Sequence, residues 1–198
     1  MKKTSWVPIV IGIAFGLLSG IANAAGLTFN ITLAGGVINS IGFYAILYML
    51  SAALGGPLAG FLTAEIDLIS LVLVGSPDMK AYFSDPITFW TNSIGVGVSI
   101  ALVGFAYRLI YQRFKMPMRL LLWIGIVIFY YIVAILFFTI SYHFFGVQVQ
   151  VELSLSEYYL TTLKGFLPQL ISDIVITSLI WIALPEHYRR PLWYEPKK

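Results

Sequence analysis

Residues 1–26 read MKKTSWVPIVIGIAFGLLSGIANAAG, and their interpretation decides how many helices the chain has. Two lysines, an apolar run and an Ala-Asn-Ala end are typical of a secretory signal with a small-residue cleavage site. However, the apolar run over residues 6–22 exceeds the roughly 7–15 residues usual for a signal. We therefore predict that this stretch is retained as a membrane-spanning helix.

Small residues recur at every fourth position of the same stretch, at Gly12, Gly16, Gly20 and Ala24. Residues with this spacing lie along one face of a helix, where they let a second helix approach closely. Two partners remain open: another helix of this chain, or a helix of a separate membrane subunit.

The composition is that of a membrane protein. Of the 198 residues, 59% are hydrophobic and 11% are charged, whereas about a quarter of a soluble domain is charged. The length suits one domain over residues 1–198. The absence of cysteine excludes thiolate chemistry. Two histidines offer little to a metal centre or a Ser-His-Asp arrangement, so we expect no metal, no cofactor and no catalytic residue.

Six apolar stretches approach the roughly 20 residues that a spanning helix needs. They cover residues 5–26, 35–54, 57–75, 88–111, 119–143 and 159–184. Gly55-Gly56-Pro57 predicts a tight turn between the second and third. The alternating pattern from Val147 to Leu155 indicates a short strand or extended segment. The expected fold is an all-α integral membrane protein, a bundle of six transmembrane helices.

Basic residues set the expected orientation, because cytoplasmic loops carry an excess of lysine and arginine. With the N-terminus in the cytoplasm, only Lys80 and Lys164 lie on the outer side. The inner side then holds Lys2, Lys3, Arg108, Arg113, Lys115, Arg119, Arg189, Arg190, Lys197 and Lys198. We expect a multi-pass protein of the cell membrane with both termini cytoplasmic. Basic residues at membrane boundaries give no reason to expect a nucleic-acid partner.

Ionisable residues inside the predicted spans are costly and usually face a partner, a cavity or a pathway. Glu65 and Asp67 are about 200° apart on a helix, so they cannot form a catalytic pair on one face. A hydrogen bond to another helix, with Asn92 or Lys164 for instance, is the alternative to a functional role. Gln169 and Asp173 are four residues apart and share a face, which favours a structural polar contact.

Aromatic and polar residues gather near the predicted outer ends of the later helices. Tyrosine and tryptophan there are most often a lipid belt, yet additional hydrogen-bonding groups suit a small-ligand pocket. We leave both interpretations open. The candidate substrate-binding residues, which include one from the first outer loop, are Asn30, Trp90, Asn92, Tyr142, His143, Tyr159 and Lys164.

Taken together, these features resemble the substrate-binding S components of energy-coupling factor (ECF) transporters, which take up vitamins. The resemblance covers nearly the whole chain and includes the small-residue first helix. It also includes GGPLAGFLTAEIDLISLVLVG (55–75) with the following stretch to Lys115, and LTTLKGFLPQLISDIVITSLIWIAL (160–184).

The resemblance implies a function and partners. It implies capture of a vitamin-like small molecule at the outer face, by loops 27–35, 76–86 and 145–157. It also implies a transmembrane coupling subunit that docks on Gly12, Gly16, Gly20 and Ala24, and two ATPase subunits, all supplied as separate chains. The chain itself would not be an enzyme.

Other functions remain as alternatives. One is a membrane sensor or scaffold without transport activity, although the short tail after the last span offers no output domain. Another is a stand-alone small-molecule carrier. A lipid-modifying enzyme fits less well, because Glu65 and Asp67 point to different faces.

Overall fold

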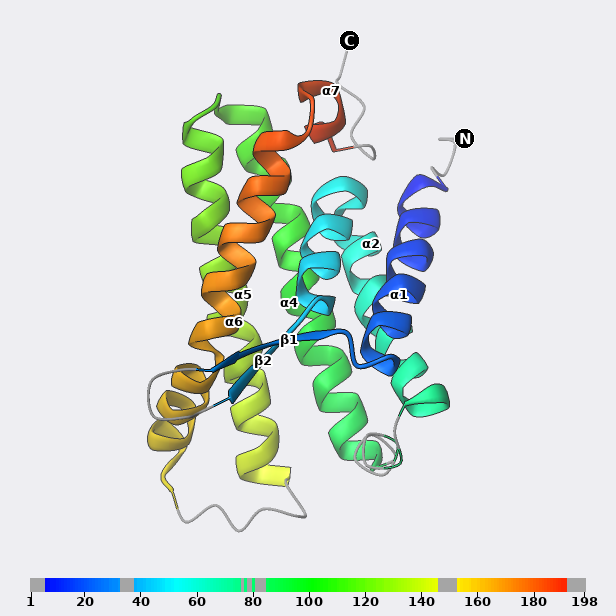
Figure 1. Cartoon of the computed structure of the whole chain (residues 1–198), viewed down its shortest axis with the longest axis vertical. Coiled ribbons are helices and arrows are strands. Elements are labelled where there is room, and N and C mark those ends of the chain that lie inside the picture. Colours follow the sequence, from blue (N-terminus) through cyan, green and yellow to red (C-terminus); the bar gives the residue numbers. More distant parts are fainter. Residues whose placement is uncertain are drawn as a thin grey trace.

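A computed structural model describes residues 6–32, 38–75, 77, 80, 85–145 and 153–191. The described residues form a helical bundle with a two-stranded hairpin (Figure 1). The helices are α1 (Val7–Ala24), α2 (Tyr44–Val74), α4 (Pro86–Arg113), α5 (Met118–Phe145), α6 (Leu155–Ala183) and the short α7 (Glu186–Arg189). Strands β1 (Thr28–Thr32) and β2 (Ile38–Gly42) pair antiparallel, with Asn30 opposite Ser40.

Within the described residues, five helices are long and apolar enough to cross a membrane, whereas the sequence predicted six spans. The difference lies in α2, which combines the expected spans 35–54 and 57–75. At Gly56 the backbone leaves the helical region with φ 84° and ψ −172°, a conformation that glycine adopts readily. There the chain folds back, as the predicted Gly-Gly-Pro turn requires.

The first arm of α2 is too short to span. Residues 38–42 form β2 instead of helix, so this arm begins at Tyr44 and reaches the turn at Gly56. At 1.5 Å per residue it covers roughly 18 Å, against about 30 Å of hydrocarbon. The two arms pack against each other: the Thr63 hydroxyl donates to Ser51 Oγ at 2.8 Å.

The other predicted spans agree with the observed helices to within a few residues. Figure 1 shows α1 beginning and α6 ending at the same end of the bundle, which we call the terminal end. We call the opposite end, where α4 begins and α5 ends, the distal end. Residues 147–152, where the sequence predicts an extended segment, lie outside the described residues, and Leu155 begins α6.

The glycine face of α1 is filled by the second arm of α2. A methyl group added at Gly12 would lie 2.8 Å from Leu62 Cβ, and one at Gly16 would lie 2.7 Å from Ile66 Cβ. One at Gly20 would lie 2.5 Å from Ser70 Cβ. Of the two partners left open by the sequence, the structure supplies the one within the chain. A docking subunit would therefore have to contact residues of α1 other than these three glycines; the predicted contact at Ala24 stays a prediction.

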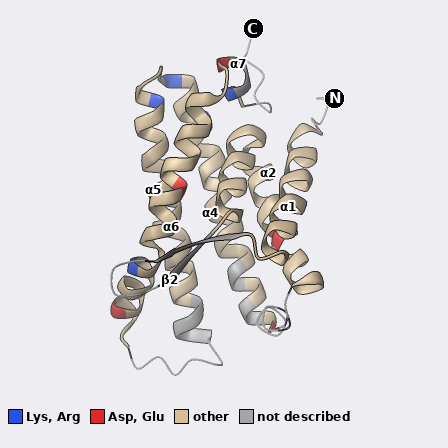
Figure 2. Cartoon of the chain, in the orientation of Figure 1, with Lys and Arg blue, Asp and Glu red and all other residues tan. Residues whose placement is uncertain are grey.

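The polarity of the molecule suits a bilayer. Long apolar side chains such as Ile13, Leu73 and Leu179 are exposed, whereas Thr63, Asp67 and Asp173 are buried. In Figure 2, the acidic positions within α2 and α6 stand out from helices that carry little other charge, and basic residues lie near the terminal end. Exposed apolar surface on this scale marks contact with lipid or with another protein.

Candidate functional site

A cavity of about 460 Å³ lies among α1, α2, α4, α5 and α6. This volume is within the range of roughly 300–1,000 Å³ that is usual for small-molecule sites. Aromatic rings dominate its wall, with aliphatic side chains between them and a few polar groups. The lining residues are Asn23, Tyr44, Tyr48, Asp67, Leu68, Leu71, Val96, Tyr130, Tyr131, Ala134, Ile135, Phe138 and Phe166.

Asp67 is the acidic residue of the lining, and its side chain is only 1% exposed. Asn23 at the end of α1 donates from Nδ2 to both carboxylate oxygens, at 3.0 and 2.8 Å. The hydroxyl of Tyr48, from the first arm of α2, donates to Oδ2. Asp67 therefore holds together α1 and both arms of α2 beside the cavity.

Asp173 of α6 forms a second buried polar centre. Its carboxylate accepts from the Tyr131 hydroxyl and from Gln169 Nε2, the latter at 2.9 Å. This bond confirms that Gln169 and Asp173 share a helix face. Tyr131 also lines the cavity, so the second centre adjoins its wall.

Gln169 also fixes the β-hairpin to the bundle. Its side-chain oxygen accepts from Gly42 N at 2.7 Å, and its side-chain nitrogen donates to Gly42 O at 2.9 Å. This two-point contact places the end of β2 about halfway along α6. The hairpin therefore crosses the bundle in front of its helices, as Figure 1 shows, and Tyr44 of the cavity follows directly.

Glu65 lies apart from this site. The Ser93 hydroxyl of α4 donates to Glu65 Oε2, and a methyl group added at Gly97 would lie 2.8 Å from Oε1. Glu65 and Asp67 thus contact different helices, as their angular separation predicts. The partner that the structure gives Glu65 is Ser93, whereas Oε1 is buried with no hydrogen-bond partner among the described residues. The expected partner Asn92 has a side chain outside the described part of the structure.

The predicted binding residues are distributed around the distal half of the bundle. Trp90 is 60% exposed on α4, and Lys164 is exposed on α6. The Tyr159 hydroxyl donates to Ile132 O at 3.3 Å. None of the three lines the cavity. Four other predictions concern side chains outside the described part of the structure: Asn30, Asn92, Tyr142 and His143.

The sequence did offer a signal for the cavity residues. Tyrosine in a membrane protein usually lies at the interface, yet Tyr130 and Tyr131 occupy the middle of the fifth predicted span, 119–143. Asn23 similarly ends an apolar helix. The sequence predicts that the Ala-Asn-Ala end is a cleavage motif or part of the small-residue stripe, and neither interpretation gives the Asn23 amide a role.

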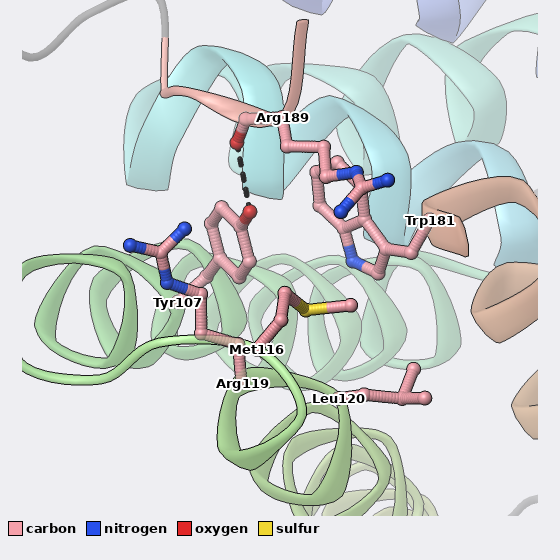
Figure 3. A pocket seen from close by; sticks show the side chains of 6 residues that line it. All are labelled: Tyr107, Met116, Arg119, Leu120, Trp181 and Arg189. Atoms are coloured by element: carbon pink, nitrogen blue, oxygen red, sulfur yellow. Dashed lines mark hydrogen bonds between the residues drawn. The ribbon is translucent and has the colours of Figure 1, made fainter. Parts of the chain in front are cut away.

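A second, much smaller cavity of about 20 Å³ lies at the terminal end, bordered by Tyr107, Arg119, Trp181 and Arg189 among others (Figure 3). It has room for about one water molecule. The rings of Tyr107 and Trp181 stack with centroids 5.0 Å apart. Aromatic packing therefore closes this end of the bundle.

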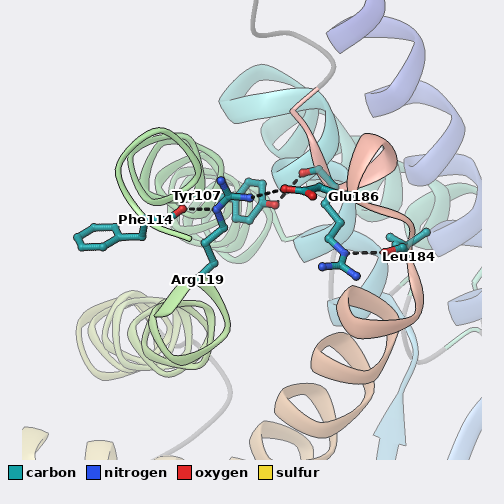
Figure 4. A network of polar contacts seen from close by, with 6 residues as sticks. Tyr107, Phe114, Arg119, Leu184 and Glu186 are labelled. Atoms are coloured by element: carbon teal, nitrogen blue, oxygen red, sulfur yellow. Dashed lines mark hydrogen bonds and ion pairs between the residues drawn. The ribbon is translucent and has the colours of Figure 1, made fainter. Parts of the chain in front are cut away.

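The two arginines beside this small cavity are engaged within the chain (Figure 4). Arg119 donates to Phe114 O, pairs with Glu186 at 3.8 Å, and lies 4.1 Å from the Tyr111 ring centroid. Arg189 Nε donates to Leu184 O at 2.6 Å. These contacts tie α7 to α4 and α5 at the terminal end.

Comparison of the chain with protein-family models, curated proteins and solved structures finds no match. Within the residues that the structure describes, no group of three or more His, Cys, Asp or Glu is placed to hold a metal ion.

Proposed function

We propose that the chain is the membrane-embedded substrate-binding subunit of a small-molecule importer of the ECF type. The observation that supports this most is the cavity of about 460 Å³, which has largely aromatic and aliphatic walls and a few convergent polar groups. A concave, mostly apolar site of this size suits the capture of one small molecule.

The orientation that we propose places the terminal end in the cytoplasm. Arg108, Arg113, Lys115, Arg119 and Arg189 lie on the segments that meet at this end, and cytoplasmic segments are rich in such residues. The cavity is then reached from outside. Packing around Tyr107 and Trp181 blocks a passage to the cytoplasm, so release requires a rearrangement of the bundle.

The partners in this proposal are those of the ECF arrangement. A transmembrane coupling subunit would meet the bundle in the membrane, and two ATPase subunits would supply the energy. The exposed face of α1, with Val10, Leu17 and Ile21, is available to such a subunit, whereas the glycine face is buried against α2.

Filling the cavity tests the proposed function. Ala134 lines the cavity and Leu136, two residues further along α5, is 43% exposed on the outer surface. We expect Ala134→Trp to abolish co-purification of the bound small molecule, detected by native mass spectrometry, because the indole occupies its space. Leu136→Trp is the matched control and should retain it.

Two results would count against this function. If both variants retain the small molecule equally and elute unchanged in gel filtration, the cavity is not the binding site. Transport of the co-purified molecule by the purified chain alone, in liposomes without ATPases, would instead identify a stand-alone carrier.

A further inference from the structure

The two buried carboxylates at the cavity, Asp67 and Asp173, have only neutral hydrogen-bond partners among the described residues. Asp67 accepts hydrogen bonds from an amide and a hydroxyl, both neutral groups. Asp173 likewise has an amide and a hydroxyl as partners. An ion pair joins Arg119 to Glu186 near the terminal end, and it involves neither of these carboxylates. Neither buried carboxylate therefore has a cationic partner in the described part of the chain.

An uncompensated buried carboxylate is expensive, because hydrogen bonds from neutral donors replace only part of its lost hydration. Asp67 is 1% exposed yet contributes to the wall of a cavity large enough for a ligand. A positive group on that ligand would supply the missing counter-charge. Among its described lining residues the cavity has no lysine, arginine or histidine, so an anionic group would find no counter-charge there.

The aromatic wall favours the same kind of ligand. The rings of Tyr44 and Tyr48 are inclined at 61°, with centroids 5.7 Å apart. Those of Tyr130 and Tyr131 are inclined at 75°, with centroids 5.0 Å apart. Steeply inclined neighbours present ring faces and edges from several directions. Ring faces attract cations, by about 0.5–2 kcal/mol depending on how far the cation is desolvated.

From these contacts we infer that the cavity binds an organic cation, with its positive nitrogen beside Asp67 and an apolar or aromatic body against the tyrosines and Phe166. This inference rests on the proposed function, and it adds the charge and shape of the substrate. The volume admits a single compact molecule, and Leu68, Leu71 and Ile135 supply apolar contacts for its body.

Three probes of nearly equal size separate charge from shape: benzylamine, which is protonated at neutral pH, benzyl alcohol and benzoate. Binding to the full-length chain in detergent is measured by saturation-transfer NMR, with dissociation constants from titration. We expect benzylamine to bind the unsubstituted chain roughly tenfold or more tightly than either other probe. This comparison needs no variant, so it does not depend on how a substitution folds.

A pair of variants on one helix then assigns the effect to a residue. Asp67→Asn keeps the size of the side chain and one acceptor, and it should weaken benzylamine binding roughly tenfold or more while leaving benzyl alcohol unchanged. Glu65→Gln removes a carboxylate two residues away that contacts Ser93 instead of the cavity. It should leave the binding of all three probes unchanged.

The outcomes separate this inference from the proposal on which it rests. If benzyl alcohol or benzoate binds as tightly as benzylamine, or if Asp67→Asn binds benzylamine as well as the unsubstituted chain does, the cation inference is overturned. Co-purification of a neutral or anionic molecule would overturn it too, yet leave the binding function standing. If no probe binds and no small molecule co-purifies, both are overturned.

Discussion

At the scale of single residues, the turn of α2 depends on one close contact. Gly104 of α4 packs directly against the backbone at Gly56 and Pro57, where the chain reverses. A methyl group at position 104 would lie 2.7 Å from the carbonyl carbon of Gly56 and from the nitrogen of Pro57. Backbone atoms in a tight turn cannot move aside as the end of a flexible side chain can.

This contact predicts opposite effects for one substitution at two sites. Gly104→Ala should lower the free energy of unfolding by about 1–3 kcal/mol, because the new methyl group overpacks the turn. Gly125→Ala, in α5, meets no atom within 4 Å among the described residues. It should be neutral or stabilising by up to about 1 kcal/mol, because alanine favours helix over glycine. Unfolding in detergent measures both, and equal effects would contradict the assigned contact.

Some residues of the site could be predicted from the sequence and others could not. Asp67 and Asp173 were identifiable because a carboxylate inside a predicted span is unusual by itself. The pairing of Asp67 with Asn23 and Tyr48 depends on three helical segments meeting. No local pattern encodes such a meeting, so the grouping of the tyrosines beside Asp67 is visible only in the tertiary structure.

At the scale of elements, hydropathy predicted the long helices well but missed the β-hairpin. Residues 35–54 are apolar enough to pass for a span, and this concealed the strand at Ile38–Gly42. The available signal was Gly35-Gly36, a turn-forming pair between two stretches that contain β-branched residues. The length of the apolar stretch favours a helix, whereas its turn-forming glycines favour a hairpin.

The interface between α1 and α2 gives a prediction at this scale. Gly16→Leu should disrupt the folded chain itself, because the added side chain meets Ile66 of α2. We expect this variant to melt at a lower temperature than the unsubstituted chain, or to aggregate in gel filtration, with no partner present. Ala14→Leu adds a similar volume at an exposed position of the same helix and should melt normally. A well-folded Gly16→Leu chain that fails only to assemble would restore the docking role of the stripe.

At the scale of the whole molecule, the proposed orientation can be tested by site-directed labelling, since the chain has no cysteine of its own. Ser156, near the start of α6, and Lys115, between α4 and α5, are exposed and lie at opposite ends of the bundle. In intact cells, a membrane-impermeant maleimide should label Ser156→Cys. It should label Lys115→Cys only after permeabilisation. The reverse labelling pattern would show that the molecule has the opposite orientation, with the cavity reached from the cytoplasm.

The anchoring of the hairpin by Gln169 bears on how the membrane potential affects ligand binding. Backbone at mid-depth is tolerated where it is buried in protein or lines a water-filled space, and β2 ends about halfway along α6. With the terminal end in the cytoplasm, a cation that reaches Asp67 from outside has crossed part of the field. A full crossing is worth about 2.3 kcal/mol per charge at 100 mV. An inside-negative cell would therefore load this site more fully than a depolarised one at the same external concentration.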